Sequence, residues 1–284
     1  MTGSPLMLFT DLDGSLLDHL SYSFEPARPM LEALRDMDVP VVLTSSKTRA
    51  EIEQIRGELG NSHPFIVENG AAVFIPVGYF SRQPDGTVRR EDYWVHECSA
   101  GRSQWLRLLA GLESRYPGEY DYFFRAGPAG ISTMTGLDLA AAELANQREY
   151  SEPVQWLGSD ARKFGFAAEL AAAGANPLQG GRFLTVAGDC DKGRALTWLR
   201  EAYRKAWNLK QVHDLAAGDS GNDVAMLEAA QTALVIRSPV HDFPPLNRTD
   251  EVIYSTRPGP EGWAEGVDRW LESQSPTADR LEGP

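Results

Sequence analysis

Short apolar runs that alternate with amphipathic helical patterns are the feature that most restricts the fold of this chain. Residues 6–10 (LMLFT) and 39–45 (VPVVLTS) are apolar or β-branched and short, which is typical of buried strands. Residues 28–38 and 47–60 repeat apolar side chains at helical spacing, and residues 64–70 predict a third strand. Strands that alternate with helices in this way favour a parallel sheet with crossover helices.

This alternation is interrupted in the middle of the chain and then resumes. The middle contains polar and Gly/Pro-rich pieces, including PDG at 84–86, which predicts a hairpin turn. The further expected elements are helices at 101–116, 136–148, 159–174, 192–207 and 219–230, and strands at 182–187, 212–217 and 232–237.

The sequence therefore predicts an α/β fold: a doubly wound parallel-sheet (Rossmann-like) core with an inserted α+β cap domain. We assign residues 1–82 and 187–284 to the core and residues 83–186 to the cap. The polar tail at 273–284 is expected to be disordered.

Charge and cysteine content exclude several classes of function. The chain of 284 residues has a formal net charge of −13, which disfavours nucleic acid and anionic membrane partners. Its two cysteines, Cys98 and Cys190, are far apart and predict neither a disulfide framework nor a Cys-rich zinc site. No apolar run approaches ~18 residues, so we expect a soluble cytoplasmic protein with a small-molecule partner. The sequence does not indicate the oligomeric state.

Polar side chains follow several of the expected strands. Asp11 and Asp13 follow the first strand, Ser45 the second and Asn69 the third, while Asp219 comes directly after the strand at 212–217. The carboxyl ends of parallel strands meet at one edge of a sheet. Each motif taken alone also fits a turn or a helix cap. Their occurrence in order along one predicted core favours a functional site.

The chemistry of this set points to phosphate. Asp223 lies four residues after Asp219, so the two share a helix face, and with Asp11 and Asp13 up to four carboxylates converge. These carboxylates would repel one another unless a cation lay between them. Oxygen atoms are the ligands that Mg²⁺ prefers, so the set favours a bound Mg²⁺. With Lys192, the metal would make a pocket for a phosphate dianion. One carboxylate can then attack phosphorus, and another can transfer the proton.

Four motifs in this order resemble those of phosphatases of the haloacid dehalogenase superfamily: DLDGS (11–15), VVLTSSK (41–47), DKGRAL (191–196) and GDSGNDVAML (218–227). The resemblance implies that Asp11 is the nucleophile and Asp13 the general acid and base, with Ser45 and Lys192 binding the phosphoryl group. It also implies that the metal is held by Asp11, the carbonyl oxygen of Asp13, Asp219 and Asp223. Ser15 stands where such proteins usually have Thr.

Further stretches, including PFIVENGAAVFIP (64–76) and REYSEPVQW (148–156), resemble the mannosyl-3-phosphoglycerate phosphatase branch of that superfamily. This resemblance implies hydrolysis of a phosphorylated sugar-glycerate to mannosylglycerate, a compatible solute. The implied substrate-binding residues are Ser46, Lys47, Asn69, Arg148, Ser151, Glu152, Gln179 and Arg182.

Three alternatives stay open at this stage. One is a glucosyl-3-phosphoglycerate phosphatase or a broader sugar phosphatase of the same superfamily. The second is a phosphomutase, which shares the nucleophile but transfers the phosphoryl group to a second sugar. The third is a receiver-like signalling module that keeps its phosphoryl group. The second carboxylate of the DLD motif and the large insert argue against the receiver, which needs neither.

Overall fold

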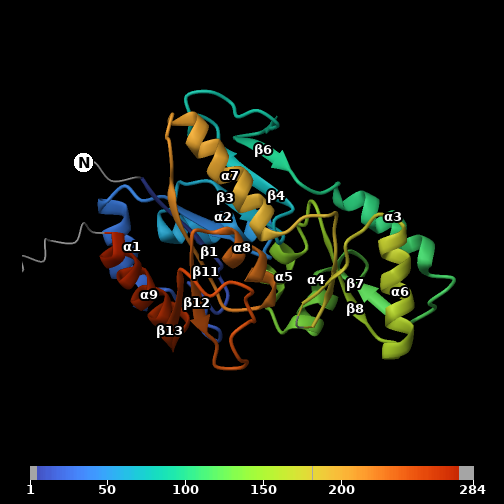
Figure 1. Ribbon diagram of the computed structural model, residues 1–284. Helices are drawn as coiled ribbons and strands as arrows, with labels where there is room; N and C mark the ends of the chain where they lie inside the picture. Colours follow the sequence, from blue (N-terminus) through green and yellow to red (C-terminus); the bar gives the residue numbers. More distant parts are fainter. Residues whose placement is uncertain (1–4, 181, 275–284) are drawn as a thin grey trace, which may run out of the picture. The chain divides into compact units, whose positions relative to one another are not determined.

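The computed structural model describes residues 5–180 and 182–274, and contacts between residues divide the chain into two compact units (Figure 1). Unit 1 comprises residues 1–41 and 211–284, and unit 2 comprises residues 42–210. Of the tail that was expected to be disordered, Ser273 and Gln274 complete a helix, and residues 275–284 lie outside the described residues. None of the helices in the described part is long and apolar enough to cross a membrane.

Unit 1 contains four parallel strands in the order β13-β12-β11-β1. Every residue of the first strand after Leu6 is buried, as expected for a parallel strand that is covered on both faces. In the pairing of β1 with β11, Thr10 lies opposite Ala217. The strands are β1 (Leu6–Thr10), β11 (His213–Gly218), β12 (Thr232–Arg237) and β13 (Val252–Pro258).

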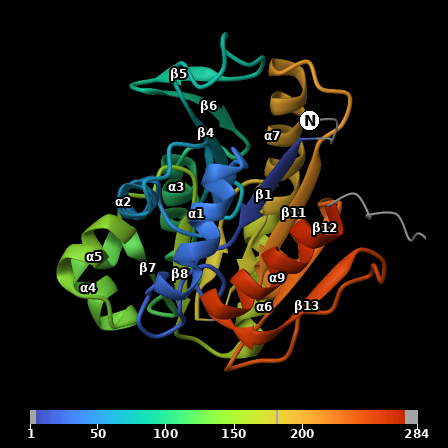
Figure 2. The ribbon, with the colours of Figure 1, turned by 90° about the vertical axis from the view of Figure 1, so that its left-hand side faces the viewer.

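Helices cover both faces of these four strands. The α9 helix runs along the strands and packs against α1 (Figure 2). The α8 helix joins β11 to β12 by a crossover. Trp263, Val267 and Trp270 form the buried stripe of α9. The helices are η1 (Glu25–Ala27), α1 (Arg28–Asp36), η2 (Gly221–Asp223), α8 (Val224–Ala229) and α9 (Gly259–Gln274).

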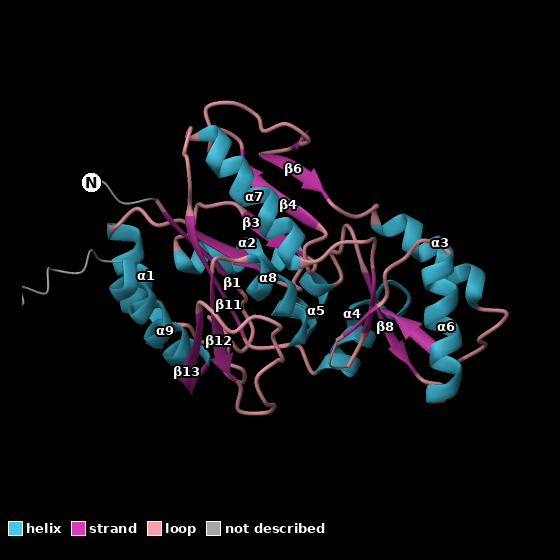
Figure 3. Cartoon of the chain, viewed as in Figure 1, coloured by secondary structure: helices cyan, strands magenta, loops and turns pink. Residues whose placement is uncertain are grey.

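Unit 2 contains two groups of strands (Figure 3). The first has the order β2-β3-β4-β6-β5, in which only the β2–β3 pair is parallel, and the second is an antiparallel sheet with the order β7-β8-β10-β9. The strands are β2 (Val41–Thr44), β3 (Phe65–Val67), β4 (Ala72–Pro76), β5 (Val88–Arg90), β6 (Tyr93–Glu97), β7 (Tyr120–Tyr122), β8 (Glu152–Trp156), β9 (Leu178–Gln179) and β10 (Leu184–Val186).

The antiparallel sheet has its own apolar core. Trp105 and Leu109 of one helix and Phe166 and Leu170 of another pack against this sheet, in one cluster with Val154 of β8. This arrangement of a small sheet with its own helices and core fits the α+β character expected for the insert. The helices of unit 2 are α2 (Arg49–Leu59), α3 (Arg102–Leu112), α4 (Phe123–Thr135), α5 (Leu139–Ala145), α6 (Asp160–Ala172) and α7 (Lys192–Ala206).

Two local predictions for the insert were wrong or incomplete. The PDG turn at 84–86 lies between β4 and β5, which do not pair with each other. The tight hairpin instead joins β5 to β6, and Glu91 and Asp92 form its turn. Glu91 has a left-handed φ of 50°. The sequence also gave no indication of α4, whose Gly127 and Pro128 are typical of loops. The chain accommodates them with a kink at Gly127, where φ is 62°.

Both cysteines are free, as predicted, and each is only partly buried. Desolvation raises the pKa of Cys98 to about 11 and that of Cys190 to about 12. The two thiols are therefore protonated at neutral pH.

We predict that Gly262→Ala destabilises the protein by about 1–3 kcal/mol, the usual cost of overpacking. A methyl group at Gly262 would overlap the carbonyl oxygen of Arg257 and would lie 2.7 Å from the hydroxyl of Ser255. The control is Gly57→Ala in α2, where nothing lies within 4 Å of the added carbon. This control should gain stability, by ~0.5–1 kcal/mol. Urea unfolding measures both changes, and equal effects would contradict the close packing of α9.

Folding stability should depend on pH through His63, which hydrogen-bonds the hydroxyl of Tyr79 at 2.8 Å. Burial and the charge of Arg56 lower the pKa of His63 to about 4. The unfolded chain takes up this proton near pH ~6.5, so stability is lost as the pH falls from about 6.5 to about 4. His63→Gln should flatten this part of the stability profile measured by urea unfolding, and an unchanged slope would contradict the assignment.

Candidate functional site

The loop after β1 turns back on itself directly behind Asp11. The amide of Gly14 donates to the carbonyl oxygen of Leu17 at 2.9 Å, and the amide of Leu17 donates to the carbonyl oxygen of Leu12 at 2.8 Å. Gly14 has a φ of +77°, which side-chain-bearing residues rarely adopt. The chain therefore leaves the strand abruptly at this point and keeps Asp11 at the strand end, where the amide of Asp11 donates to the carbonyl oxygen of Ala217 at 2.9 Å.

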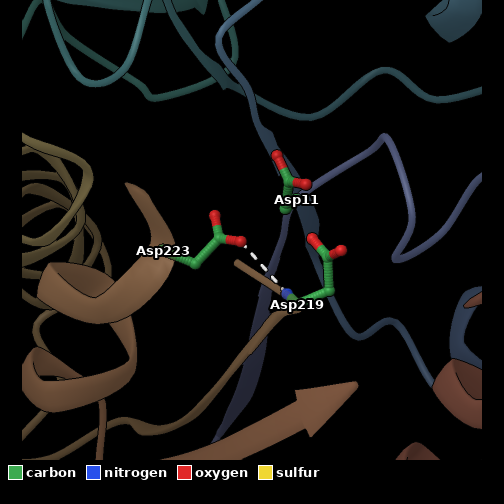
Figure 4. A group of neighbouring side chains, drawn as sticks. All are labelled: Asp11, Asp219 and Asp223. Carbon is green, nitrogen blue, oxygen red and sulfur yellow. Dashed lines mark hydrogen bonds between the residues drawn. The ribbon is translucent and has the colours of Figure 1, made fainter. Parts of the chain in front are cut away.

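Three of the predicted carboxylates meet in unit 1. Asp11, Asp219 and Asp223 are buried, and one ligand oxygen from each lies within 4.8 Å of the others (Figure 4). Oδ2 of Asp223 accepts hydrogen bonds from the backbone amides of Asp219 at 3.1 Å and Ser220 at 3.0 Å. These bonds fix the turn that follows β11 and orient its two aspartates. Asp13 is not a member of the three-carboxylate group, and the assignment of its carbonyl oxygen as a metal ligand stays a prediction.

Two glycines make room for this cluster. A Cβ atom on Gly14 would lie 2.7 Å from Oδ2 of Asp219, and one on Gly218 would lie 2.5 Å from the Cβ of Asp223. Both distances are too short for a side chain, so the close approach of these segments requires glycine. The need for Gly218 was not recognised in the sequence, because it arises from the turn that brings Asp223 back over the strand end.

The chemistry of the donor set fits a hard divalent cation. Buried carboxylates at this separation repel one another, and a bound cation offsets the repulsion. Oxygen-only ligands are typical of Mg²⁺ rather than of zinc or copper. Nε2 of His241, whose side chain is 41% exposed, lies 3.5 Å from Oδ2 of Asp219.

In unit 2, the predicted residues Ser45 and Asn69 are joined through the backbone. The amide of Ser45 donates to the carbonyl oxygen of Ile66 at 3.0 Å, and the amide of Asn69 donates to the carbonyl oxygen of Ser45 at 2.9 Å. The hydroxyl of Ser45 accepts the amide of Lys47 at 3.2 Å. The loop that carries Ser45, Ser46 and Lys47 is thus tied to the end of β3.

The next residue begins the α2 helix. Thr48 and Glu51 form a reciprocal capping box: the hydroxyl of Thr48 accepts the amide of Glu51 at 3.2 Å, and the carboxylate of Glu51 accepts the amide of Thr48 at 2.8 Å. This cap fixes where the Ser45–Lys47 loop ends and the helix starts.

Lys192 is the first residue of α7 and is fully buried. The side chain of Asp191 caps this helix by accepting the amide of Arg194 at 2.8 Å. Gly70, with a φ of +90°, packs directly on the backbone here, and a Cβ atom on it would overlap the carbonyl group of Asp191. Gly70 therefore determines how closely the start of α7 approaches the turn after β3.

Arg148 and Ser151 form a hydrogen bond with each other, and both contact Glu68, a residue that the sequence did not point to. The hydroxyl of Ser151 donates to Oε2 of Glu68 at 2.5 Å and accepts from Nη1 of Arg148 at 3.0 Å. Nη2 of Arg148 donates to the carbonyl oxygen of Ser46 at 3.3 Å. No signal in the sequence marks Glu68, because its partners are some 80 positions away along the chain.

The other three predicted substrate-binding residues lie apart from this network. Glu152 is fully buried and accepts hydrogen bonds from Nε of Arg102 at 2.5 Å and from the amide of Phe124 at 2.8 Å. Gln179 is exposed and donates to the carbonyl oxygen of Gly180. Arg182 is exposed and donates to the last carbonyl groups of α4. Their roles in substrate binding stay predictions.

We predict that Mg²⁺ raises the midpoint of thermal unfolding, because binding to the folded state at about 100 times Kd adds ~2.7 kcal/mol of stability. Asp219→Asn should abolish this increase, since the amide lacks the negative charge. Asp268→Asn, at an exposed position on α9, is the matched control and should retain it. An equal Mg²⁺ effect in the Asp219 variant would contradict metal binding at the three-carboxylate group.

Comparisons with known proteins show the family to which this chain is similar. Residues 8–80 match the haloacid dehalogenase-like hydrolase family, and residues 178–271 match the sucrose-6F-phosphate phosphohydrolase family. A glucosyl-3-phosphoglycerate/mannosyl-3-phosphoglycerate phosphatase of Methanococcoides burtonii is 36% identical over 262 residues, covering 92% of this chain and 95% of that protein.

Solved structures of low sequence identity share the fold. A haloacid dehalogenase-like hydrolase of B. subtilis superposes with a TM-score of 0.60 at 18% identity, covering 94% of this chain and 98% of the other. A haloacid dehalogenase subclass IIB sugar phosphatase gives a TM-score of 0.60 at 13% identity, with the same coverage. These similarities confirm the predicted fold class. Because of the 36% identity over nearly its whole length, the chain belongs to the haloacid dehalogenase superfamily of hydrolases.

Proposed function

We propose that this protein is a divalent-metal-dependent phosphatase that removes the phosphate from a glycosyl-3-phosphoglycerate. The observation that carries the reaction type is the buried group of Asp11, Asp219 and Asp223 beside a D-x-D loop. The substrate class is supported by the identity to the Methanococcoides phosphatase, whose name includes both the glucosyl and the mannosyl ester. We favour the mannosyl ester, on the stretches at 64–76 and 148–156, and keep the glucosyl ester as the alternative.

In the proposed mechanism Asp11 is the nucleophile. Its carboxylate attacks phosphorus, the bond to the leaving alkoxide breaks, and the phosphoryl group is held as an aspartyl-phosphate. Asp13 donates its proton to the departing oxygen and then takes a proton from the water that hydrolyses the aspartyl-phosphate. A bound Mg²⁺ would supply positive charge to the phosphoryl oxygens, with Asp11, the carbonyl oxygen of Asp13, Asp219 and Asp223 as its protein ligands.

The cationic and hydroxyl groups of unit 2 have the complementary role. We assign Ser45 and Lys192 to the phosphoryl oxygens, since a hydroxyl and an ammonium stabilise the charge that develops during transfer. Lys47 and Arg148 are assigned to the carboxylate of the glycerate moiety. In a protein with a net charge of −13, such local cations are needed to hold a substrate with two anionic groups.

The remaining proposed contacts are directed at the sugar and the glycerate. They are Ser46, Asn69, Ser151, Glu152, Gln179 and Arg182. The side chains of Ser151 and Glu152 have hydrogen-bond partners within the protein, so their contribution would be to shape the site as well as to bind.

The substrate assignment is tested with a panel of phosphate esters in the presence of Mg²⁺. We expect the highest kcat/KM for mannosyl- or glucosyl-3-phosphoglycerate and lower values for simple hexose phosphates. A preference for the hexose phosphates would contradict the glycerate assignment. Transfer of phosphate to a second sugar, with no release to water, would indicate a phosphomutase.

The two aspartates of the D-x-D loop should respond differently to substitution. Asp11→Asn should abolish turnover, because a neutral amide cannot act as the nucleophile. Asp13→Asn should lower kcat by roughly 10² or more, the usual contribution of general acid–base catalysis, while Mg²⁺ still stabilises the protein. Steady-state kinetics and thermal unfolding measure the two effects. Near-normal activity of the Asp11 variant would rule out its proposed role.

A further inference from the structure

Glu68 is a buried carboxylate whose role the proposed mechanism leaves open. It directly follows β3, and its side chain has no exposed surface. Glu68 and Asn69 have φ values of 51° and 61°, and two consecutive non-glycine residues in the left-handed region are uncommon. Such a conformation costs free energy and persists only where surrounding contacts hold it.

The contacts that hold Glu68 come from one segment, residues 148–151. Its carboxylate accepts hydrogen bonds from the amides of Glu149 at 2.8 Å and Tyr150 at 3.3 Å, and from the hydroxyl of Ser151 at 2.5 Å. Nη1 of Arg148 lies 3.7 Å from Oε2 of Glu68. Burying a carboxylate without such donors is costly, so the segment and the carboxylate stabilise each other.

The same network continues to the loop that carries Ser45. The amide of Glu68 donates to the carbonyl oxygen of Lys47 at 3.0 Å, and Nη2 of Arg148 donates to the carbonyl oxygen of Ser46. The guanidinium of Arg148 is therefore held between Glu68 on one side and the Ser45–Lys47 loop on the other. A planar guanidinium that is fixed in this way has a defined direction for its remaining donors.

One hydrogen-bond donor of Arg148 has no acceptor within the described part of the chain. Its Nε is buried and has no hydrogen-bond partner there. Buried donors of this kind are rare in proteins and call for an explanation. A carboxylate ligand at this edge of the guanidinium would provide the missing acceptor.

We propose that Glu68 is a positioning residue for recognition of a second anionic group on the substrate. It orients Arg148 beside the Ser45–Lys47 loop so that the guanidinium binds a carboxylate carried by the phosphate ester. The ligand class is thus a phosphomonoester with a carboxylate, such as a phosphoglycerate. This inference rests on the proposed phosphatase function and deepens it, because it assigns the selection of carboxylated esters to a residue that contacts neither phosphate nor metal.

The test compares two inhibitors of aryl phosphate hydrolysis, 3-phosphoglycerate and inorganic phosphate. Both bear phosphate, and only the first has a carboxylate. In the wild-type protein, 3-phosphoglycerate should bind more tightly. In Glu68→Gln, its inhibition constant should rise about tenfold, the scale of one weakened charge-assisted hydrogen bond, while that of inorganic phosphate stays within about twofold. A loss of folded protein would lower the rate but would leave both inhibition constants unchanged.

Arg148→Lys should give the same selective loss, because an ammonium retains the charge but not the fork of donors. The double variant should lose little more than either single variant, since both changes disrupt one interaction. Glu58→Gln, on the exposed surface of α2, is the matched control and should behave as wild type. Additive losses, or equal weakening of both inhibitors, would overturn the proposal. Failure of the wild-type protein to hydrolyse glycosyl-3-phosphoglycerates would instead count against the proposed substrate.

Discussion

The parallel pairing of β1 with β11 is the constraint on which the proposed chemistry of unit 1 depends. Its register sets Thr10 opposite Ala217, so the two strands end within one residue of each other and bring Asp11 and Asp219 close together. The short turn after β11 then returns Asp223 to the same point. This concentration of negative charge would be unfavourable alone, and it becomes useful when a divalent cation and a phosphate share it.

The residues around this strand end are as closely constrained in their identity as the carboxylates. Glycines at 14 and 218 leave the space that the aspartates occupy. Behind β1, the indole of Trp263 in α9 donates to the hydroxyl of Thr10 at 2.9 Å, which anchors the residue before Asp11. In unit 2, Glu68 has a comparable function, because its buried carboxylate holds a distant segment to the turn after β3, while its amide donates to the loop after β2. In both units, buried residues hold in place those that are proposed to bind the substrate or the metal.

The sequence predicted the parts of the protein that follow local rules. Strands β1, β2, β3, β10, β11 and β12, most helices and the carboxylates that follow β1 and β11 were predicted from periodicity and position, because each depends on neighbouring residues. The strands β4 to β9 and β13 were not predicted. Glu68, Gly70 and Trp263 were missed, since their roles arise from contacts with residues far away in the chain. The hairpin was misplaced for a related reason: PDG has the stronger local turn signal, but the pairing of β5 with β6 selected Glu91 and Asp92.

Asp11 is proposed to accept the phosphoryl group before water does, and the stereochemical course at phosphorus tests this role most directly. A phosphorothioate ester that is made chiral with two oxygen isotopes and hydrolysed in water of the third gives a chiral product. Two successive in-line displacements, first by Asp11 and then by water, retain its configuration. We predict retention. Inversion would show a single displacement by water and would contradict the role of Asp11 as nucleophile.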